Sequence, residues 1–227
     1  MLLAVAAMLI AAAALAQSTD PKTIVREGIA LFDAGKIDEA IAKYKAALAL
    51  DPELAVTRYE LALAYTVKQD YAKCRAVLEP VIEKSGAAMP TLYEALGNCH
   101  DGAGDRDKAI AAYRKGLEVA PDSPHIAYNL AISLTASGEL DEARTLLKQD
   151  LIAIPNHVSA RYALGRVFEA QAFRVPALFE YLRFLALEPD SPRGADAAAR
   201  ARTLLDMGVE KKGKKNINIM VNPDSRK

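Results

Sequence analysis

The sequence lacks the short motifs that usually identify catalytic and nucleotide-binding sites. Its 227 residues contain no G-x-x-x-x-G-K-[ST], no H-E-x-x-H, no C-x-x-C and no G-x-S-x-G. Cys99, His100 and Asp101 supply a nucleophile, a base and a carboxylate, but adjacent residues of a helix point about 100° apart and cannot converge on one substrate. His125 and His157 have no ligand partners at the spacing of a metal-binding motif. We therefore expect no enzyme, no cofactor, no metal and no small-molecule substrate.

An excess of charge of either sign is also absent. The chain has 29 basic and 29 acidic residues, so its formal net charge is zero. Nucleic acids and anionic lipids are attracted by a strongly basic surface, which this balance does not provide. We expect no nucleic-acid partner, and a membrane association only through the N-terminal segment.

The charge balance is broken near the C-terminus. Residues 210–227 carry a local net charge of +4 and a short apolar, strand-like group, Ile217, Ile219, Met220 and Val221. We expect a basic flexible tail. The alternative is a docking peptide that pairs with the sheet edge of a partner or folds back onto the protein itself.

The first 16 residues contain no charge and resemble a secretory signal peptide. They are shorter than the ~20 residues of a membrane-spanning helix, and Ala14-Leu15-Ala16 has the small-x-small form of a cleavage site. We expect a signal peptide over residues 1–16 and a short linker over 17–20. The alanine-rich, charged composition then favours export to the bacterial periplasm. Because the segment begins without Lys or Arg, an uncleaved inner-membrane anchor and a buried helix remain alternatives.

The chain does contain a repeat. A small residue recurs within apolar segments at steps of 34, 35, 34 and 34 residues, and a second small residue follows it with the same steps. The first series is Gly28, Ala62, Gly97, Ala131 and Gly165, and the second is Ala40, Cys74, Ala109, Ala143 and Ala177. A period of this length indicates stacked helix pairs, and such arrays are usually binding surfaces.

This pattern resembles the tetratricopeptide repeat, which reads W-x2-L-G-x2-Y, then A-x3-F, then P. The third unit shows it in Leu96, Gly97, Ala109, Tyr113 and Pro121. No unit has the tryptophan, and Arg161 replaces it in the fifth. The resemblance implies an all-α fold, a superhelical solenoid of about five helix-turn-helix repeats with a C-terminal capping helix. The expected ranges are 21–53, 54–89, 90–122, 123–156 and 157–190 for the repeats and 191–209 for the capping helix.

The small residues have a physical reason. Two antiparallel helices can approach closely only where side chains are small, so Gly97 and Ala109 are expected at a crossing that Tyr113 fills. Gly35 and Gly104 each follow a first helix, where a left-handed helix terminus favours glycine. Gly138 has the same place in the fourth unit.

The two cysteines allow a single disulfide. Cys74 occupies the small-residue position of the second unit, where a free thiol serves as a compact apolar group, so we expect structural thiols. A Cys74–Cys99 disulfide is the alternative, because the two residues lie in neighbouring helices and an exported protein meets an oxidising compartment.

The resemblance also implies a binding face, because the first helices of tetratricopeptide repeats line a concave groove. The implied partner-binding residues are Phe32, Tyr59, Leu63, Glu94, Asn98, Tyr128, Ile132, Thr135, Tyr162 and Arg166. Tyrosines at one register offer a large contact area with a polar tip. Asn98 could hold a peptide backbone, and Arg166 could meet a carboxylate. The alternative is that the tyrosines only pad the inner wall.

We therefore expect a non-enzymatic scaffold or adaptor of the bacterial envelope that binds an extended peptide segment of a partner protein. The alternatives are a self-associating array, which would be a homo-oligomer, and an accessory subunit of an envelope enzyme. A receptor for chaperone tails is not expected. Such receptors use a lysine and several asparagines on this face, and Asn98 is the one residue here that resembles them. The sequence predicts that Tyr128→Ala with Tyr162→Ala weakens partner capture without loss of helix.

Overall fold

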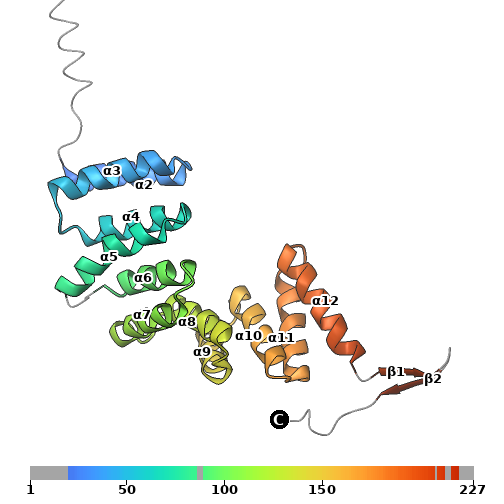
Figure 1. Ribbon diagram of the computed structural model, residues 1–227. Helices are drawn as coiled ribbons and strands as arrows, with labels where there is room; N and C mark the ends of the chain where they lie inside the picture. The colour runs from blue at the N-terminus through green and yellow to red at the C-terminus, as the bar shows by residue number, and fades with distance from the viewer. Residues whose placement is uncertain (1–19, 86–88, 208, 213–215, 220–227) are drawn as a thin grey trace, which may run out of the picture. The chain divides into compact units, whose positions relative to one another are not determined.

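The computed structural model describes residues 20–85, 89–207, 209–212 and 216–219 (Figure 1). Over these residues the chain forms eleven helices and one short two-stranded hairpin, which confirms the predicted all-α class for the body of the protein. The expected signal peptide lies outside the described residues. None of the described helices combines the length and the apolar character that crossing a bilayer requires.

The helices form two compact units that meet in sequence between Val119 and Ala120. In the first unit, each helix pair packs together, and the first helices of consecutive pairs also contact one another. Its helices are α2 (Pro21–Asp33), α3 (Ile37–Leu50), α4 (Ala55–Val67), α5 (Tyr71–Ser85), α6 (Pro90–Gly102) and α7 (Arg106–Val119).

The second unit repeats this arrangement and ends in an unpaired helix. The helix α12 packs on α11, and α8 contacts α10. Its elements are α8 (Pro124–Ser137), α9 (Leu140–Ala153), α10 (Val158–Ala170), α11 (Arg174–Leu187), α12 (Pro192–Asp206), β1 (Val209–Lys212) and β2 (Asn216–Ile219).

A tyrosine fills the helix crossing wherever the first small residue is glycine. A β-carbon added at Gly97 would lie 2.3 Å from Cε1 of Tyr113, and one added at Gly165 would lie 2.8 Å from Cε1 of Tyr181. Gly28 meets Tyr44 in the same way, at 2.6 Å. The second and fourth repeats use a different pair, with alanine at the glycine register and leucine at the tyrosine register. These four residues, Ala62 with Leu78 and Ala131 with Leu147, are fully buried.

The turns within the repeats use a left-handed residue, as the sequence predicted for three of them. Gly35, Gly104 and Gly138 have φ values of +75°, +83° and +85°. The other two left-handed residues, Gln69 and Ala172, were not predicted, because they are not glycine; their φ values are 57° and 59°. Such a conformation costs roughly 1–2 kcal/mol for a residue with a β-carbon.

Cys74 and Cys99 are joined by a disulfide between α5 and α6, with their Cα atoms 5.9 Å apart. The expectation of structural thiols is therefore corrected. Both cysteines are fully buried. The disulfide therefore links the second repeat to the third inside the core. Register alone predicted that they were neighbours, but not that their side chains meet.

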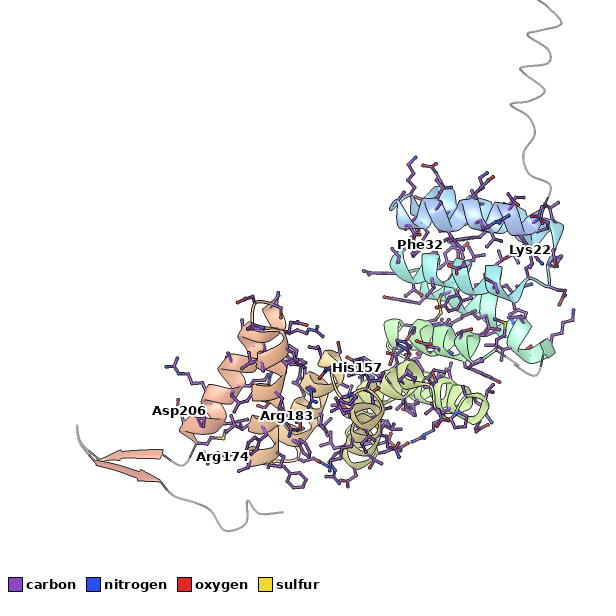
Figure 2. The ribbon with its side chains drawn as sticks, turned by 180° about the vertical axis from the view of Figure 1, so that it is seen from behind. Lys22, Phe32, His157, Arg174, Arg183 and Asp206 are labelled. Atoms are coloured by element: carbon purple, nitrogen blue, oxygen red, sulfur yellow. A yellow bond between two sulfur atoms is a disulfide. The ribbon has the colours of Figure 1, made fainter. Side chains whose placement is uncertain are left out.

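The helix α12 caps the second unit and is fixed at both ends. Ser191 accepts a hydrogen bond from the Gly194 amide at 3.0 Å, as expected for a helix start. At the other end, near the labelled Asp206 in Figure 2, the Arg174 guanidinium donates to the carbonyls of Leu204 and Leu205. Orphan carbonyls of a helix terminus are thereby satisfied.

The described part of the basic tail forms a hairpin where a flexible segment was expected. The strands β1 and β2 pair antiparallel, with Val209 opposite Ile219 and Lys212 opposite Asn216. The strand-like group seen in the sequence thus pairs, over Ile217 and Ile219, with the chain's own preceding residues. Met220 and Val221 lie outside the described residues.

Candidate partner-binding surface

All ten candidate residues lie on the first helices of the repeats, and we call this set the first-helix face. Phe32 lies on α2, Tyr59 and Leu63 on α4, and Glu94 and Asn98 on α6; Tyr128, Ile132 and Thr135 lie on α8, and Tyr162 and Arg166 on α10. None of them is fully buried: Ile132 and Arg166 are exposed, and the others are partly buried. Each therefore presents some surface to a partner, whether or not it binds one.

In the first unit, Tyr59 on α4 is the one tyrosine among the candidate residues. Its ring is partly buried and packs against the core, and no hydrogen bond of its hydroxyl is seen among the described residues. Burial raises the pKa of Tyr59, and the negative charges of Glu94 and Glu60 add to this effect. The hydroxyl of Tyr59 therefore stays protonated near neutral pH and can donate a hydrogen bond to a ligand.

Asn98 is held from within the protein. Its Oδ1 accepts a hydrogen bond of 2.7 Å from the Tyr113 hydroxyl, which also reaches Asp101 at 3.3 Å. The side-chain amide of Asn98 is thereby fixed in orientation by a buried residue of α7. A side chain held in this way loses little conformational entropy when it binds a peptide backbone.

An apolar hollow of about 470 Å³ adjoins the first-helix face between α2 and the start of α4. It lies toward the Lys22 end of α2, and Figure 2 shows Lys22 and Phe32 at opposite ends of this helix. Thr57 lines the hollow, is fully buried, and has a hydroxyl without a partner. The lining residues are Asp20, Lys22, Val25, Arg26, Ile29, Leu54, Val56 and Thr57. The hollow suits an apolar side chain with a polar group that could reach Thr57.

In the second unit, Tyr128 is packed against the start of α10. Its ring centroid lies 5.3 Å from that of His157, and its hydroxyl forms a hydrogen bond with the Ser159 side chain. His157 in turn contacts the buried carboxylate of Asp150, with Nδ1 2.5 Å from Oδ2. Tyr128 is therefore a partly exposed surface residue with an internal structural role.

Tyr162 has a stronger structural role than the sequence predicted. Its hydroxyl donates to Asp196 of α12 at 2.5 Å, and its ring lies 5.2 Å from that of Phe184. Replacing Tyr162 with alanine would remove contacts that hold the capping helix. The sequence-based expectation that Tyr162→Ala leaves the helices intact is therefore not supported by the packing. For Tyr162, the alternative that the tyrosines only pad the inner wall of the solenoid describes the observed contacts better than a role in binding.

Three residues complete the face in the second unit. Ile132 is 40% exposed, and Thr135 donates its hydroxyl to the Ala131 carbonyl at 2.6 Å. Arg166 is exposed, and its positive charge contributes to the lowered pKa of Asp196. Arg166 thus presents a cation at the surface of this part of the face, where it could meet a carboxylate.

Arg58 and Arg161 share a role that was not predicted from the sequence, and they occupy the same register in the second and fifth repeats. Arg58 donates to the Pro52 carbonyl at 3.0 Å, and Arg161 donates to the Pro155 carbonyl. Each arginine thereby ties its helix to the turn that precedes it. A comparison of this position across the repeats would have revealed the pair, because Arg58 lies four residues before Ala62 as Arg161 does before Gly165. Their function is to stabilise the fold, and neither belongs to the first-helix face.

Comparison with protein families shows tetratricopeptide repeats in this chain. The family model described as TPR repeat matches residues 28–67, and the one described as tetratricopeptide repeat matches residues 102–167. The Hsp70-Hsp90 organizing protein of Triticum aestivum is 34% identical over 106 residues, which cover 46% of this chain and 18% of that protein. The chain thus spans less than a fifth of this relative's length.

Solved structures share the fold. A structure described as YrrB, a TPR protein with an unusual peptide-binding site, has a TM-score of 0.63 and 21% identity, over 81% of this chain and 94% of that one. A structure from Pseudomonas aeruginosa, pilF, has a TM-score of 0.69 and 13% identity, over 81% and 88% of the two chains. These likenesses confirm the predicted solenoid of tetratricopeptide type.

Proposed function

We propose that this chain, which carries tetratricopeptide repeats, is a non-enzymatic adaptor that binds an extended peptide segment of a partner protein on its first-helix face. One observation carries the proposal. All ten residues of that face keep exposed surface, whereas the small residues of the repeat and the tyrosines that fill the helix crossings are buried in the core. A surface that mixes aromatic, apolar and polar groups is typical of peptide recognition.

The chemistry of the face differs between the two units. The first unit offers the apolar hollow beside α2, then Tyr59, then the oriented amide of Asn98. The second unit offers Ile132 and the exposed cation of Arg166. A peptide bound on the first unit should therefore be partly apolar with polar groups for Asn98, and a peptide bound on the second unit should offer a carboxylate to Arg166. YrrB, which has a similar fold, is described as having an unusual peptide-binding site, and this supports peptide binding by analogy of fold alone.

Export to the bacterial envelope is part of the proposal. The disulfide between Cys74 and Cys99 supports it, because disulfides persist in the periplasm and are rare in a reducing cytosol. The charge-free residues 1–16 supply the signal, with an uncleaved anchor as the alternative.

Affinity capture from an envelope extract tests the proposal with three versions of the protein. The Tyr59→Ala/Arg166→Ala variant alters one residue of the face in each unit and leaves no buried polar group without its partner. Phe179→Ala is the control, because Phe179 is 58% exposed on the second helix α11. We expect the face variant to lose a partner that the intact protein and the control retain. Equal capture by all three would rule out the face.

Self-association is the second candidate function, and one observation favours it. Val175, Phe179 and Leu182 are each nearly half exposed or more, and their spacing places them on one side of α11. Exposed apolar stripes of this kind often mark contacts between protein chains. Sedimentation of the intact protein and of Phe179→Glu distinguishes the two functions, because a monomer at working concentration excludes the self-associating array.

A further inference from the structure

A hollow of about 300 Å³ lies in the second unit among α9, α10 and α11, and we call it the α9–α11 hollow. Most of its lining residues belong to the second helices α9 and α11, and none of the ten residues of the first-helix face lines it. Arg183 of α11, which Figure 2 labels, is one of the lining residues. The hollow is therefore distinct from the candidate peptide-binding face.

The charged side chains that line the hollow are three cations and one carboxylate. Both oxygens of this carboxylate, which belongs to Glu180, are already bound by arginines. Arg161 donates to Oε2 at 3.2 Å, and Arg183 donates to Oε1 at 3.0 Å. Lys148 is the third cation, and the lining residues that the structure describes include no second carboxylate for it. The lining therefore has an excess of positive charge.

The cations of the hollow lie beside apolar side chains. Lys148 and Ile152 are four residues apart and are thus neighbours on one side of α9, where Ile152 is 80% exposed. The Lys148 ammonium also lies 5.6 Å from the ring centroid of Phe168, a second apolar lining residue. The side chain of Arg183 is 62% exposed. A ligand in the hollow would therefore meet positive charge and apolar surface together.

The boundary between the first and second repeats repeats part of this arrangement. Lys45 lies 5.9 Å from the ring centroid of Tyr65, and it has the register that Lys148 has in the fourth repeat. Pro80, however, stands in the second repeat where the fifth has Arg183. The contact between a lysine and an aromatic ring thus recurs, but this boundary lacks the second exposed cation.

We propose that the α9–α11 hollow binds an acidic side chain of a partner protein together with the apolar side chain next to it. The carboxylate would pair with Lys148 and Arg183, and the apolar side chain would pack on Ile152. Charge complementarity favours an anion, because the positive charge exceeds what Glu180 neutralises. A volume of about 300 Å³ suits a pair of side chains. The protein would then hold partners on two surfaces, the first-helix face and this hollow.

Fluorescence anisotropy of two labelled peptides with the whole protein tests the preference for an acidic side chain. The acidic probe is an acetylated, amidated ten-residue peptide of Gly and Ser with one central Glu-Glu-Leu segment, and the reference probe has Gln in place of both Glu. We expect the acidic probe to bind about tenfold more tightly, and high salt to reduce the difference. Equal binding of the two probes would overturn the proposal.

Three variants locate the binding site of the acidic probe. Lys148→Gln and Arg183→Gln each remove one cation of the hollow and should weaken binding by about three- to tenfold. Lys45→Gln is the matched control, because it removes the same charge from an exposed lysine over an aromatic ring. It should bind as the intact protein does. An equal loss in all three variants would show an effect of overall charge and would overturn the proposal, as would unchanged binding in all three.

Protection of lysines from acetylation gives a readout that needs no substitution. Mass spectrometry measures how fast an amine-reactive reagent modifies each lysine of the intact protein. The bound acidic probe should slow the modification of Lys148 and leave that of Lys45 unchanged. Equal protection of the two lysines, or protection of neither, would contradict binding in the hollow.

Two further outcomes separate this site from other surfaces. The Tyr59→Ala/Arg166→Ala variant should keep the acidic probe. Loss of the probe in this variant, with binding retained in Lys148→Gln, would place the acidic side chain on the first-helix face and overturn the proposal. Sedimentation tests a second copy as the occupant. A dimer of the intact protein that becomes a monomer in Lys148→Gln would show that another copy fills the hollow in place of a partner protein, which would also overturn the proposal.

Discussion

The phenol ring of Tyr113 lies directly over the α-carbon of Gly97, so that a β-carbon at residue 97 would come within 2.3 Å of the ring. The contact joins α6 to α7 and leaves no space for a methyl group. The same relationship holds for Gly28 with Tyr44 and for Gly165 with Tyr181. Repeats with alanine at this register have leucine in place of tyrosine, so the two positions are matched in size.

Gly97→Ala should destabilise the protein by about 1–3 kcal/mol, because overpacking of the crossing outweighs the better helix propensity of alanine. Urea unfolding measures the change. Adding Tyr113→Leu reproduces the alanine and leucine pair of the second and fourth repeats, and should make the double variant more stable than the sum of the single effects. Strictly additive effects would show that the two residues do not share one space.

Removal of a tyrosine hydroxyl should have opposite effects in the first and fifth repeats. Tyr181→Phe removes a hydrogen bond to a carboxylate and should cost about 1.5–3 kcal/mol. Tyr44→Phe removes a buried hydroxyl that has no partner, and should leave stability unchanged or raise it by about 1 kcal/mol. Thermal melting of the two variants side by side checks this. A comparable loss in both would mean that Tyr44 has a partner in solution.

Reduction of the disulfide should weaken the first unit. The bond closes a loop between residues 25 apart, for which chain-entropy arguments give about 3 kcal/mol of stabilisation. The melting temperature of the intact protein should fall on addition of a reductant, whereas Cys74→Ala/Cys99→Ala should melt at a temperature independent of reductant. Intact mass should rise by two protons on reduction, and an unchanged mass would mean that the thiols are free.

Stability should also fall on mild acidification, through His100. Burial lowers the pKa of this histidine, helped by Arg75 and Lys108 and opposed by Asp105 and Glu79. The unfolded chain therefore takes up a proton at a higher pH than the folded protein, and stability is lost as the pH falls below about 6.5.

Urea midpoints at pH 7.5 and pH 5.5 measure this effect. His100→Phe keeps an aromatic residue in the core and should show a smaller difference between the two midpoints. The exposed His125 provides the control, since His125→Phe should leave the difference unchanged. An equal pH dependence in His100→Phe and the intact protein would assign the effect to other groups.

The period of the sequence predicted the helix crossings and the glycine turns, because these depend on residue size and on backbone conformation within one repeat. It did not predict the left-handed Ala172, since the local sequence there carries no glycine. Nor did it predict the contact of Tyr162 with Asp196. That bond joins a repeat to the capping helix, where the register of the array no longer applies.

The candidate face, too, was predicted from the sequence only in part. Tyr59 and Arg166, which register assigned to this face, keep exposed surface, and their role in binding stays a prediction. Register could not predict which polar groups are already hydrogen-bonded within the protein, because these bonds come from residues of another helix, such as Tyr113. For the same reason, the sequence could not predict that the buried Tyr44 hydroxyl has no hydrogen-bond partner among the described residues.

Photo-crosslinking of a bound peptide tests most directly whether the first-helix face binds the partner. A peptide selected from a peptide array for binding to the whole protein would carry a photoreactive phenylalanine analogue, and the crosslinked residues would be mapped by mass spectrometry. We predict crosslinks to α2, α4 and α6 or to α8 and α10, and their loss on competition with the unmodified peptide. Crosslinks confined to the second helices, such as α11 around Phe179, would contradict the account.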